Sequence, residues 1–363
     1  MMRLFGGAFA GALALISNPV AAQSYHDIAD RYRDAESFNG VMLVGTGGHV
    51  EAVEGFGSAD TEHGVPMMPE TRFETGSVSK WIASIVILKL VDQGKLKLDA
   101  PISAYLPEYR PDTGARLTLR HLMSHSSGVP NQLLEARKDP AARGIELDQM
   151  EAVRRYASAD LAFEPGTAWD YSHSNWVLAK AVVERVTGQS YATLVDRLLV
   201  RPLRLKNSGV YRGDSSRVPG MAAGYERLAP QAERKPNPVP DFMAMAGGFY
   251  TTAPDLFRIM NAVLDGGFLR PASRAALTTT IMPDQHYALG GRVRVERIAG
   301  KDREAAWEDG SNGGFRMLAR RVLADGHTVI IFTNAKFDYA RLGTLGTELL
   351  DRSYASREQA RFE

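Results

Sequence analysis

The chain has 363 residues, of which 44% are hydrophobic and 23% charged, a composition typical of one large globular domain or two closely packed ones. Its 43 basic and 42 acidic residues give a formal charge of +1, and a nearly neutral chain without basic clusters offers no electrostatic footprint for nucleic acid or for an anionic membrane. The sequence contains no cysteine, which excludes disulfides, a cysteine nucleophile and thiolate metal sites.

The N-terminal segment has the pattern of an export signal. MMRLFGGAFAGALALISNPVAAQS begins with Arg3, continues as an apolar run and ends in small residues up to Ala22. This order is typical of a signal peptide, and the apolar run is short for a membrane span. We therefore expect residues 1–22 to be a signal peptide and residues 23–363 to be periplasmic or secreted, without an integral membrane span after its removal.

Strands are predicted near both ends of the chain. FNGVMLVGTGGHVEAVEGFG (38–57) reads as two strands joined by a glycine-rich turn. FRMLARRVLADGHTVIIFTNAKF (315–337) reads as two strands joined at Asp325-Gly326, with a helix from Asp338 to about Ser353. Both pairs therefore read as hairpins.

The middle of the chain is predicted to be mostly helical. In TAPDLFRIMNAVLDGG, for example, Thr252 can cap a helix that Gly266 ends. Strands at both ends with helices between them predict an α+β fold, in which the N- and C-terminal segments form one antiparallel sheet flanked by helices. We expect a single domain with an α/β part at about 23–80 and 280–363 and a mainly helical part at about 81–279.

ETGSVSKWIAS (74–84) places a serine and a lysine where a turn of small residues meets an apolar helix. Ser77 and Lys80 are three residues apart and share a helix face. A desolvated lysine can lose its proton near neutral pH and activate a serine, and the helix N-terminus can stabilise an oxyanion. The plainer interpretation is a helix cap beside a solvated lysine, but the helix is too apolar to have an ordinary exposed face.

Further stretches follow this segment in a characteristic order: LTLRHLMSHSSGVP (117–130), FEPGTAWDYSHSNWVLAKAVVERVTGQSY (163–191), RPLRLKNSGVY (201–211), AGGFYTTAPDL (246–256) and WEDGSNGGFRML (307–318). Together they resemble the serine β-lactamase-related family, in the branch of class C β-lactamases, D-specific peptidases and family VIII esterases. The resemblance runs from about Phe38 to Asn334 and implies a β-lactamase-like fold, an acyl-enzyme mechanism and no cofactor.

The resemblance also implies roles for individual residues. Ser77 would be the nucleophile, Lys80 its partner and Tyr171 the second-motif residue that helps move the proton, with Lys80 as the neighbouring cation that favours its phenolate. His173 stands where the family often has asparagine, and an imidazole that titrates near neutrality would alter the pH behaviour.

The third motif departs from the family pattern. Lysine or histidine, then threonine or serine, then glycine are common there, but this chain has Glu308, Asp309 and Gly310. Glu308 would repel a substrate carboxylate at a cost on the order of 1 to 4 kcal/mol. The backbone N–H groups of Ser311 and Ser77 can still form the oxyanion hole, because backbone donors do not depend on the side chain.

Four residues are candidates to supply the positive charge that the third motif lacks, and these are Arg292, Arg294, Lys301 and Arg316. Without them, we expect a hydrolase of small-molecule or peptide esters or amides that lack a carboxylate at this point, with an esterase first and a D-aminopeptidase second. A D,D-carboxypeptidase (penicillin-binding protein) or a β-lactamase comes third. A non-catalytic binding or regulatory relative is the alternative of another class, although a pure binder needs neither Ser77 nor a buried Lys80.

Two weaker patterns remain. His121 and His125 have the spacing of a helical metal pair, but HLMSH lacks a catalytic glutamate and no third ligand is indicated, so we expect no metal. Trp169, Tyr171 and Trp176 can line an acyl pocket or pack between helices.

Overall fold

The computed structural model describes residues 23–359. The predicted signal peptide, residues 1–22, lies outside the described residues. Twelve α-helices and thirteen strands are found in the described part of the chain.

The strands are β1 Gly40–Thr46, β2 His49–Phe56, β3 Ser58–Asp60, β4 Val65–Pro66, β5 Phe73–Glu74, β6 Gly209–Val210, β7 Tyr225–Arg227, β8 Glu233–Arg234, β9 Phe249–Thr251, β10 Arg292–Ile298, β11 Lys301–Asn312, β12 Phe315–Val322 and β13 Thr328–Thr333. The helices are α1 Tyr25–Glu36, α2 Val78–Asp92, α3 Pro111–Gly114, α4 Leu119–Met123, α5 Gln132–Ala136, α6 Gln149–Tyr156, α7 Ser174–Thr187, α8 Tyr191–Val195, α9 Ala244–Gly247, α10 Ala253–Leu264, α11 Pro271–Thr278 and α12 Tyr339–Gln359.

The main sheet joins the two ends of the chain, as the sequence predicts. Its order is β10-β11-β12-β13-β1-β2 and every neighbouring pair is antiparallel. The predicted hairpins are β1–β2 and β12–β13, and the C-terminal helix α12 begins one residue later than expected. The β10–β11 hairpin was not predicted from the sequence, and its second strand carries the third motif.

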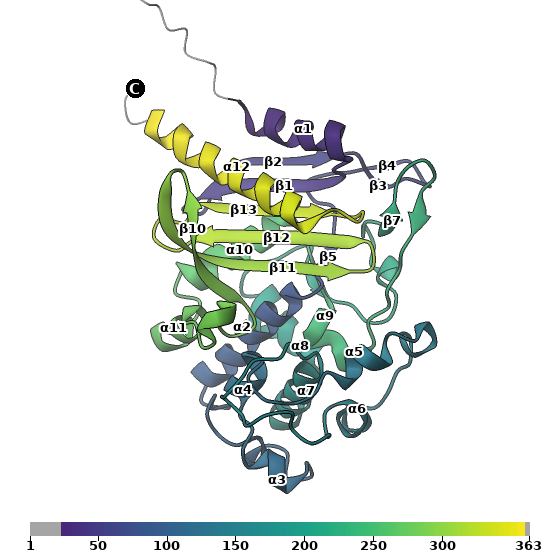
Figure 1. Cartoon of the computed structure of the whole chain (residues 1–363), viewed down its shortest axis with the longest axis vertical. Coiled ribbons are helices and arrows are strands. Elements are labelled where there is room, and N and C mark those ends of the chain that lie inside the picture. Colours follow the sequence, from purple (N-terminus) through teal and green to yellow (C-terminus); the bar gives the residue numbers. More distant parts are fainter. Residues whose placement is uncertain (1–22, 360–363) are drawn as a thin grey trace, which may run out of the picture.

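Each face of this sheet is covered by helices, because both sets of alternating side chains in β1 are apolar. Met42 and Val44 pack in one cluster with residues of α1 and α12. Val41 and Leu43 belong to the larger cluster that includes α2, α7 and α10. Figure 1 shows α12, in yellow, lying across one face of the sheet, and the mainly helical part lying beyond β11.

Helix α2 is the central helix of the molecule. Its residues from Val78 to Leu88 are all buried, and it contacts α9, α11 and β11. A helix that is apolar on all sides belongs in a core, as the sequence predicts. The turn that leads into its N-terminal end lies against the C-terminal part of β11. None of the helices in residues 23–359 combines the length and the apolar character that crossing a membrane requires.

Candidate active site

Ser77 lies at the N-terminal end of α2 and contacts both of its predicted partners. The Nζ atom of Lys80, one helical turn further on, is 3.1 Å from Ser77 Oγ. The hydroxyl of Tyr171, which is 94 residues away in sequence, donates a hydrogen bond of 2.8 Å to the same oxygen. The fold therefore brings the three predicted catalytic side chains together around one hydroxyl.

The amine of Lys80 is fully buried. It donates a hydrogen bond of 2.8 Å to the backbone oxygen of Ala246, in α9. Burial lowers the pKa of Lys80 to about 7, while the negative charges of Glu308 and Asp309 act in the opposite direction. Near neutral pH a large fraction of this amine is therefore uncharged and able to accept a proton.

Tyr171 lies in the loop before α7, and its ring stacks on the imidazole of His125 with centroids 4.3 Å apart. Burial raises the pKa of Tyr171, and only the hydrogen bond with Ser77 and the charge of Arg292 act against it. The hydroxyl bonds to Ser77, while Lys80 Nζ lies 5.0 Å from the ring centroid. The expectation that Lys80 favours a phenolate is therefore not met in the resting protein, and Tyr171 is a neutral donor.

His173 directly precedes α7, without a capping hydrogen bond from its side chain, and lines the same cavity as Ser77. Its backbone N–H donates a hydrogen bond of 3.0 Å to the side-chain oxygen of Asn131. Burial, together with the positive charges of Lys80 and Arg137, holds the pKa of His173 well below its usual value. The expectation that His173 titrates near neutrality is therefore wrong, because desolvation outweighs the ordinary imidazole value.

Strand β11 carries the third motif past the nucleophile. Glu308 is buried, and its Oε1 accepts 2.7 Å from the backbone N–H of Arg292. Burial raises the pKa of Glu308 well above its usual value, against the charge of Arg292. Of the four cations that could replace the missing lysine, Arg292 lines the cavity, and its Nη1 is 3.6 Å from Asp309 Oδ1. The guanidinium of Arg292 is therefore already paired with the carboxylate of Asp309.

Glycines allow β11 to approach the nucleophile closely. Gly76 has φ +50°, and a Cβ atom there would lie 2.5 Å from the backbone of Ser311. A Cβ atom on Gly310 would lie 2.0 Å from the backbone oxygen of Thr75. Backbone of β11 therefore packs directly on the turn that leads into Ser77, in a position that suits two converging N–H groups.

A cavity of about 520 Å³ is lined by Ser77, Tyr171, His173 and the third-motif residues 308–311, a size suited to a small organic ligand. Trp169 and Tyr171 line it as the sequence suggests, whereas Trp176 is buried in α7. Several lining residues were not predicted from the sequence. Arg137, Asn237 and Tyr287 lie outside the quoted segments and carry no spacing signal, whereas Asn312 lies inside WEDGSNGGFRML, directly after Ser311.

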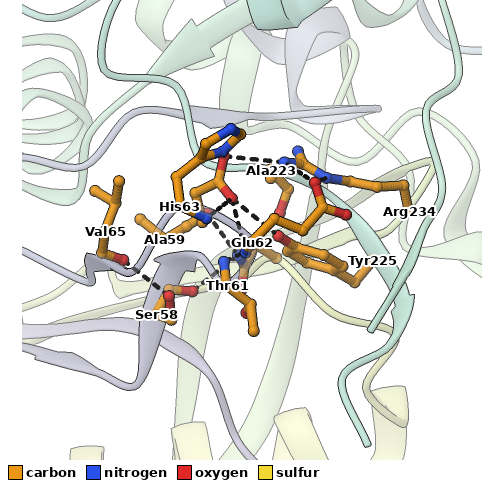
Figure 2. Close-up of polar contacts among 11 residues, drawn as sticks. Ser58, Ala59, Thr61, Glu62, His63, Val65, Ala223, Tyr225 and Arg234 are labelled. Atoms are coloured by element: carbon orange, nitrogen blue, oxygen red, sulfur yellow. Dashed lines mark hydrogen bonds and ion pairs between the residues drawn. The ribbon is translucent and has the colours of Figure 1, made fainter. Parts of the chain in front are cut away.

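One group of three potential metal-binding side chains occurs among residues 23–359, and it consists of Asp60, Glu62 and His63. Figure 2 shows that Arg234 reaches this group. Its Nη2 lies 2.9 Å from Asp60 Oδ2 and 2.8 Å from Glu62 Oε2. A cation would have to compete with this guanidinium for the same oxygens, so the arrangement is that of a surface ion-pair network.

Comparisons with known proteins agree with this geometry. The model of the family described as Beta-lactamase matches residues 26–350. Esterase EstB of Burkholderia gladioli is 35% identical over 272 residues, which are 65% of this chain and 68% of the esterase. The D-amino acid amidase of Ochrobactrum anthropi SV3 superposes with a TM-score of 0.77 at 22% identity, covering 93% of this chain and 98% of the amidase. A penicillin binding protein from Bacillus halodurans superposes with a TM-score of 0.75 at 21% identity, covering 93% of this chain and 99% of that protein.

The two structural matches establish the fold, and the family match covers most of the chain. This chain therefore belongs to the Beta-lactamase family and is a serine hydrolase of that family.

Proposed function

We propose that the protein is an exported esterase or amidase that acts through an acyl-enzyme on Ser77, with substrates that carry no free carboxylate at the third motif. The observation that carries this proposal is the pair of contacts on one hydroxyl, 3.1 Å to a buried amine and 2.8 Å to a phenol. The esterase activity named for the relative at 35% identity supports the choice of esters first.

In the first step, Ser77 Oγ attacks the substrate carbonyl carbon while its proton passes to the neutral amine of Lys80. The negative charge that forms on the carbonyl oxygen is bound by the N–H groups of Ser77 and Ser311. The bond to the leaving group then breaks, and the leaving atom takes the hydroxyl proton of Tyr171, which is restored from the Lys80 ammonium. In the second half of the reaction, water attacks the acyl carbonyl carbon and gives up a proton to the same basic groups. Ser77 Oγ is now the leaving atom and takes a proton back as the acid is released.

The third motif supports the choice of substrate. Arg292 provides a positive charge there, but its guanidinium lies 3.6 Å from Asp309 Oδ1, so a substrate carboxylate finds no unpaired cation beside the third motif. β-Lactams and D-Ala-D-Ala termini present such a carboxylate, whereas simple esters do not. A D-amino amide remains the second candidate, because its free amine suits these carboxyl groups and because a D-amino acid amidase has the same fold.

The test is a reaction of residues 23–363 and a Ser77→Ala variant with a fluorophosphonate probe, read by intact mass. The same proteins are assayed with 4-nitrophenyl butyrate, D-alanine 4-nitroanilide and nitrocefin. We expect labelling that is lost in the variant, turnover of the ester or the anilide, and little turnover of nitrocefin. Labelling that persists in Ser77→Ala would exclude Ser77 as the nucleophile, and rapid nitrocefin hydrolysis would exclude the proposed substrate preference.

A further inference from the structure

One cation in the active-site cavity has no carboxylate partner among the described residues. Arg137 follows α5 and lines the cavity together with Ser77. Its Nη1 donates 2.8 Å to the backbone oxygen of Arg143, and its Nη2 donates 2.9 Å to Asn237 Oδ1 and 2.9 Å to the backbone oxygen of Pro238. All of these acceptors are neutral, so the guanidinium is held in place without being neutralised.

The other cations of the cavity differ from Arg137 in this respect. Arg292 lies beside Asp309, and burial lowers the pKa of Lys80 to about 7, so that near neutral pH this amine is only partly protonated. Burial and the nearby Arg143 lower the pKa of Arg137, as expected for a cation in a desolvated and electropositive place. An arginine remains charged in proteins even so.

A chain of hydrogen bonds fixes this guanidinium to the strand beside the nucleophile. Asn237 accepts from Arg137 and donates 2.6 Å to Asn312 Oδ1, at the end of β11. Asn312 in turn donates to the buried carboxylate of Glu74 and, at 2.8 Å, to the backbone oxygen of Asn237. The guanidinium is thus a preorganised part of the cavity wall, with donors left over for a ligand because an arginine has five N–H groups.

The electrostatic effect of Arg137 reaches the catalytic groups. Its charge is one of the causes that lower the pKa of His173, whose ring meets that of Tyr171 at a centroid distance of 5.4 Å. Ser77 and Arg137 also line the same cavity of about 520 Å³, so one small substrate can contact both of them.

We propose that Arg137 is a specificity-determining residue that binds an anionic group, a carboxylate or a phosphate, carried by the ester or amide substrate at a distance from the scissile bond. This inference rests on the proposed function and names its substrate class. The two parts of the cavity then differ in their preference for an anion. The guanidinium of Arg137 binds it, whereas Glu308 at the third motif disfavours it.

The test compares esters that differ in one charge. 4-Nitrophenyl hydrogen adipate against 4-nitrophenyl hexanoate places the anion on the acyl side, and 4-butanoyloxybenzoate against phenyl butanoate places it on the leaving group. The ratio of kcat/KM for the charged to the uncharged ester should fall about 10- to 100-fold in Arg137→Gln in one of the two pairs. Arg137→Lys should give an intermediate fall, because it keeps the charge and loses the fork.

Lys138→Gln is the matched control, because Lys138 is the exposed neighbour that pairs with Glu135 outside the cavity. It should keep the wild-type ratio in both pairs. In the unaltered protein the ratio should also fall as ionic strength rises, and this measurement stands if Arg137→Gln does not fold.

Two outcomes separate the inference from the proposed function. Ratios in Arg137→Gln equal to those of Lys138→Gln, or wild-type ratios that do not respond to salt, overturn the role of Arg137 while fluorophosphonate labelling of Ser77 persists. Loss of labelling in the wild-type protein overturns the proposed function instead.

Discussion

The buried amine of Lys80 lies 3.1 Å from the hydroxyl oxygen of Ser77, and burial lowers the pKa of this amine to about 7. The protonated amine cannot accept the serine proton. We therefore expect kcat/KM for 4-nitrophenyl butyrate to rise with pH as Lys80 loses its proton, with the midpoint near pH 7. The rate of fluorophosphonate labelling should follow the same curve, because it reports the first step alone. A rate that is flat or falling from pH 5.5 to 8.5 would argue against Lys80 as the base.

The same lysine links stability to pH. Lys80 loses its proton near pH 7 in the folded protein but only above about pH 10 in the unfolded chain. Between these values the unfolded chain binds the additional proton, so the contribution of Lys80 to the free energy of unfolding rises with pH, and below pH 7 it stays at its lowest value.

Lys80→Met removes this dependence. The difference in the free energy of unfolding, Lys80→Met minus wild type, should therefore be highest at pH 6. It should be lower by about 3 kcal/mol at pH 9, because wild type gains stability between these values. Urea unfolding at the two pH values measures it, and Lys138→Met, at an exposed lysine, should follow wild type at both. Equal differences at the two pH values would mean that Lys80 is protonated in the folded protein throughout.

Some of this site can be predicted from the sequence because it depends on local structure. Ser77 and Lys80 are one helical turn apart, and the apolar composition of α2 predicts that their helix is buried. Tyr171 has no local relation to them and was found only through the resemblance to a family. The titration of His173 was predicted wrongly because its burial depends on segments far away in sequence.

The positions of the two cavity arginines, Arg292 and Arg137, could not be predicted from the sequence. Arg292 was one of four possible cations, and only the pairing of β10 with β11 places it beside Asp309. Arg137 follows a short helix and belongs to no motif, and its direction is set by contacts with Asn237 and Pro238, about 100 residues later. Patterns of hydrophobicity and spacing carry no information on such loop contacts.

The close approach of β11 to the turn before Ser77 gives a third prediction. Gly76→Ala adds a methyl group 2.5 Å from the backbone of Ser311, so the strand must move away from the nucleophile. Because this displaces an oxyanion donor, kcat for a neutral ester should fall about 100- to 1,000-fold in protein that circular dichroism shows to be folded.

The matched control for Gly76→Ala is Gly48→Ala. Gly48 also has a positive φ, +87°, but a Cβ atom there meets nothing within 4 Å. Both variants bear the cost of a left-handed alanine, about 1 kcal/mol, and only Gly76→Ala should lose activity. Similar kcat values in the two variants would show that the approach of Ser311 is not needed for catalysis.

The carboxyl of Glu308 gives the fourth prediction. Glu308→Gln removes the negative charge that a substrate carboxylate meets at the third motif while it keeps a side-chain oxygen that can accept from the N–H of Arg292. The ratio of kcat/KM for nitrocefin to that for 4-nitrophenyl butyrate should therefore rise about tenfold. The midpoint of the pH profile should also move to lower pH, because the charge of Glu308 raises the pKa of Lys80.

Glu304→Gln provides the control for this prediction, since Glu304 lies on the same strand with an exposed side chain. It should change neither the substrate ratio nor the pH midpoint. The two readouts test different properties of Glu308, because the ratio reports its effect on substrate and the midpoint its effect on the base. An unchanged ratio with a shifted midpoint would mean that Arg292 alone governs access of carboxylates, and an unchanged midpoint would mean that Glu308 is already protonated when Lys80 titrates.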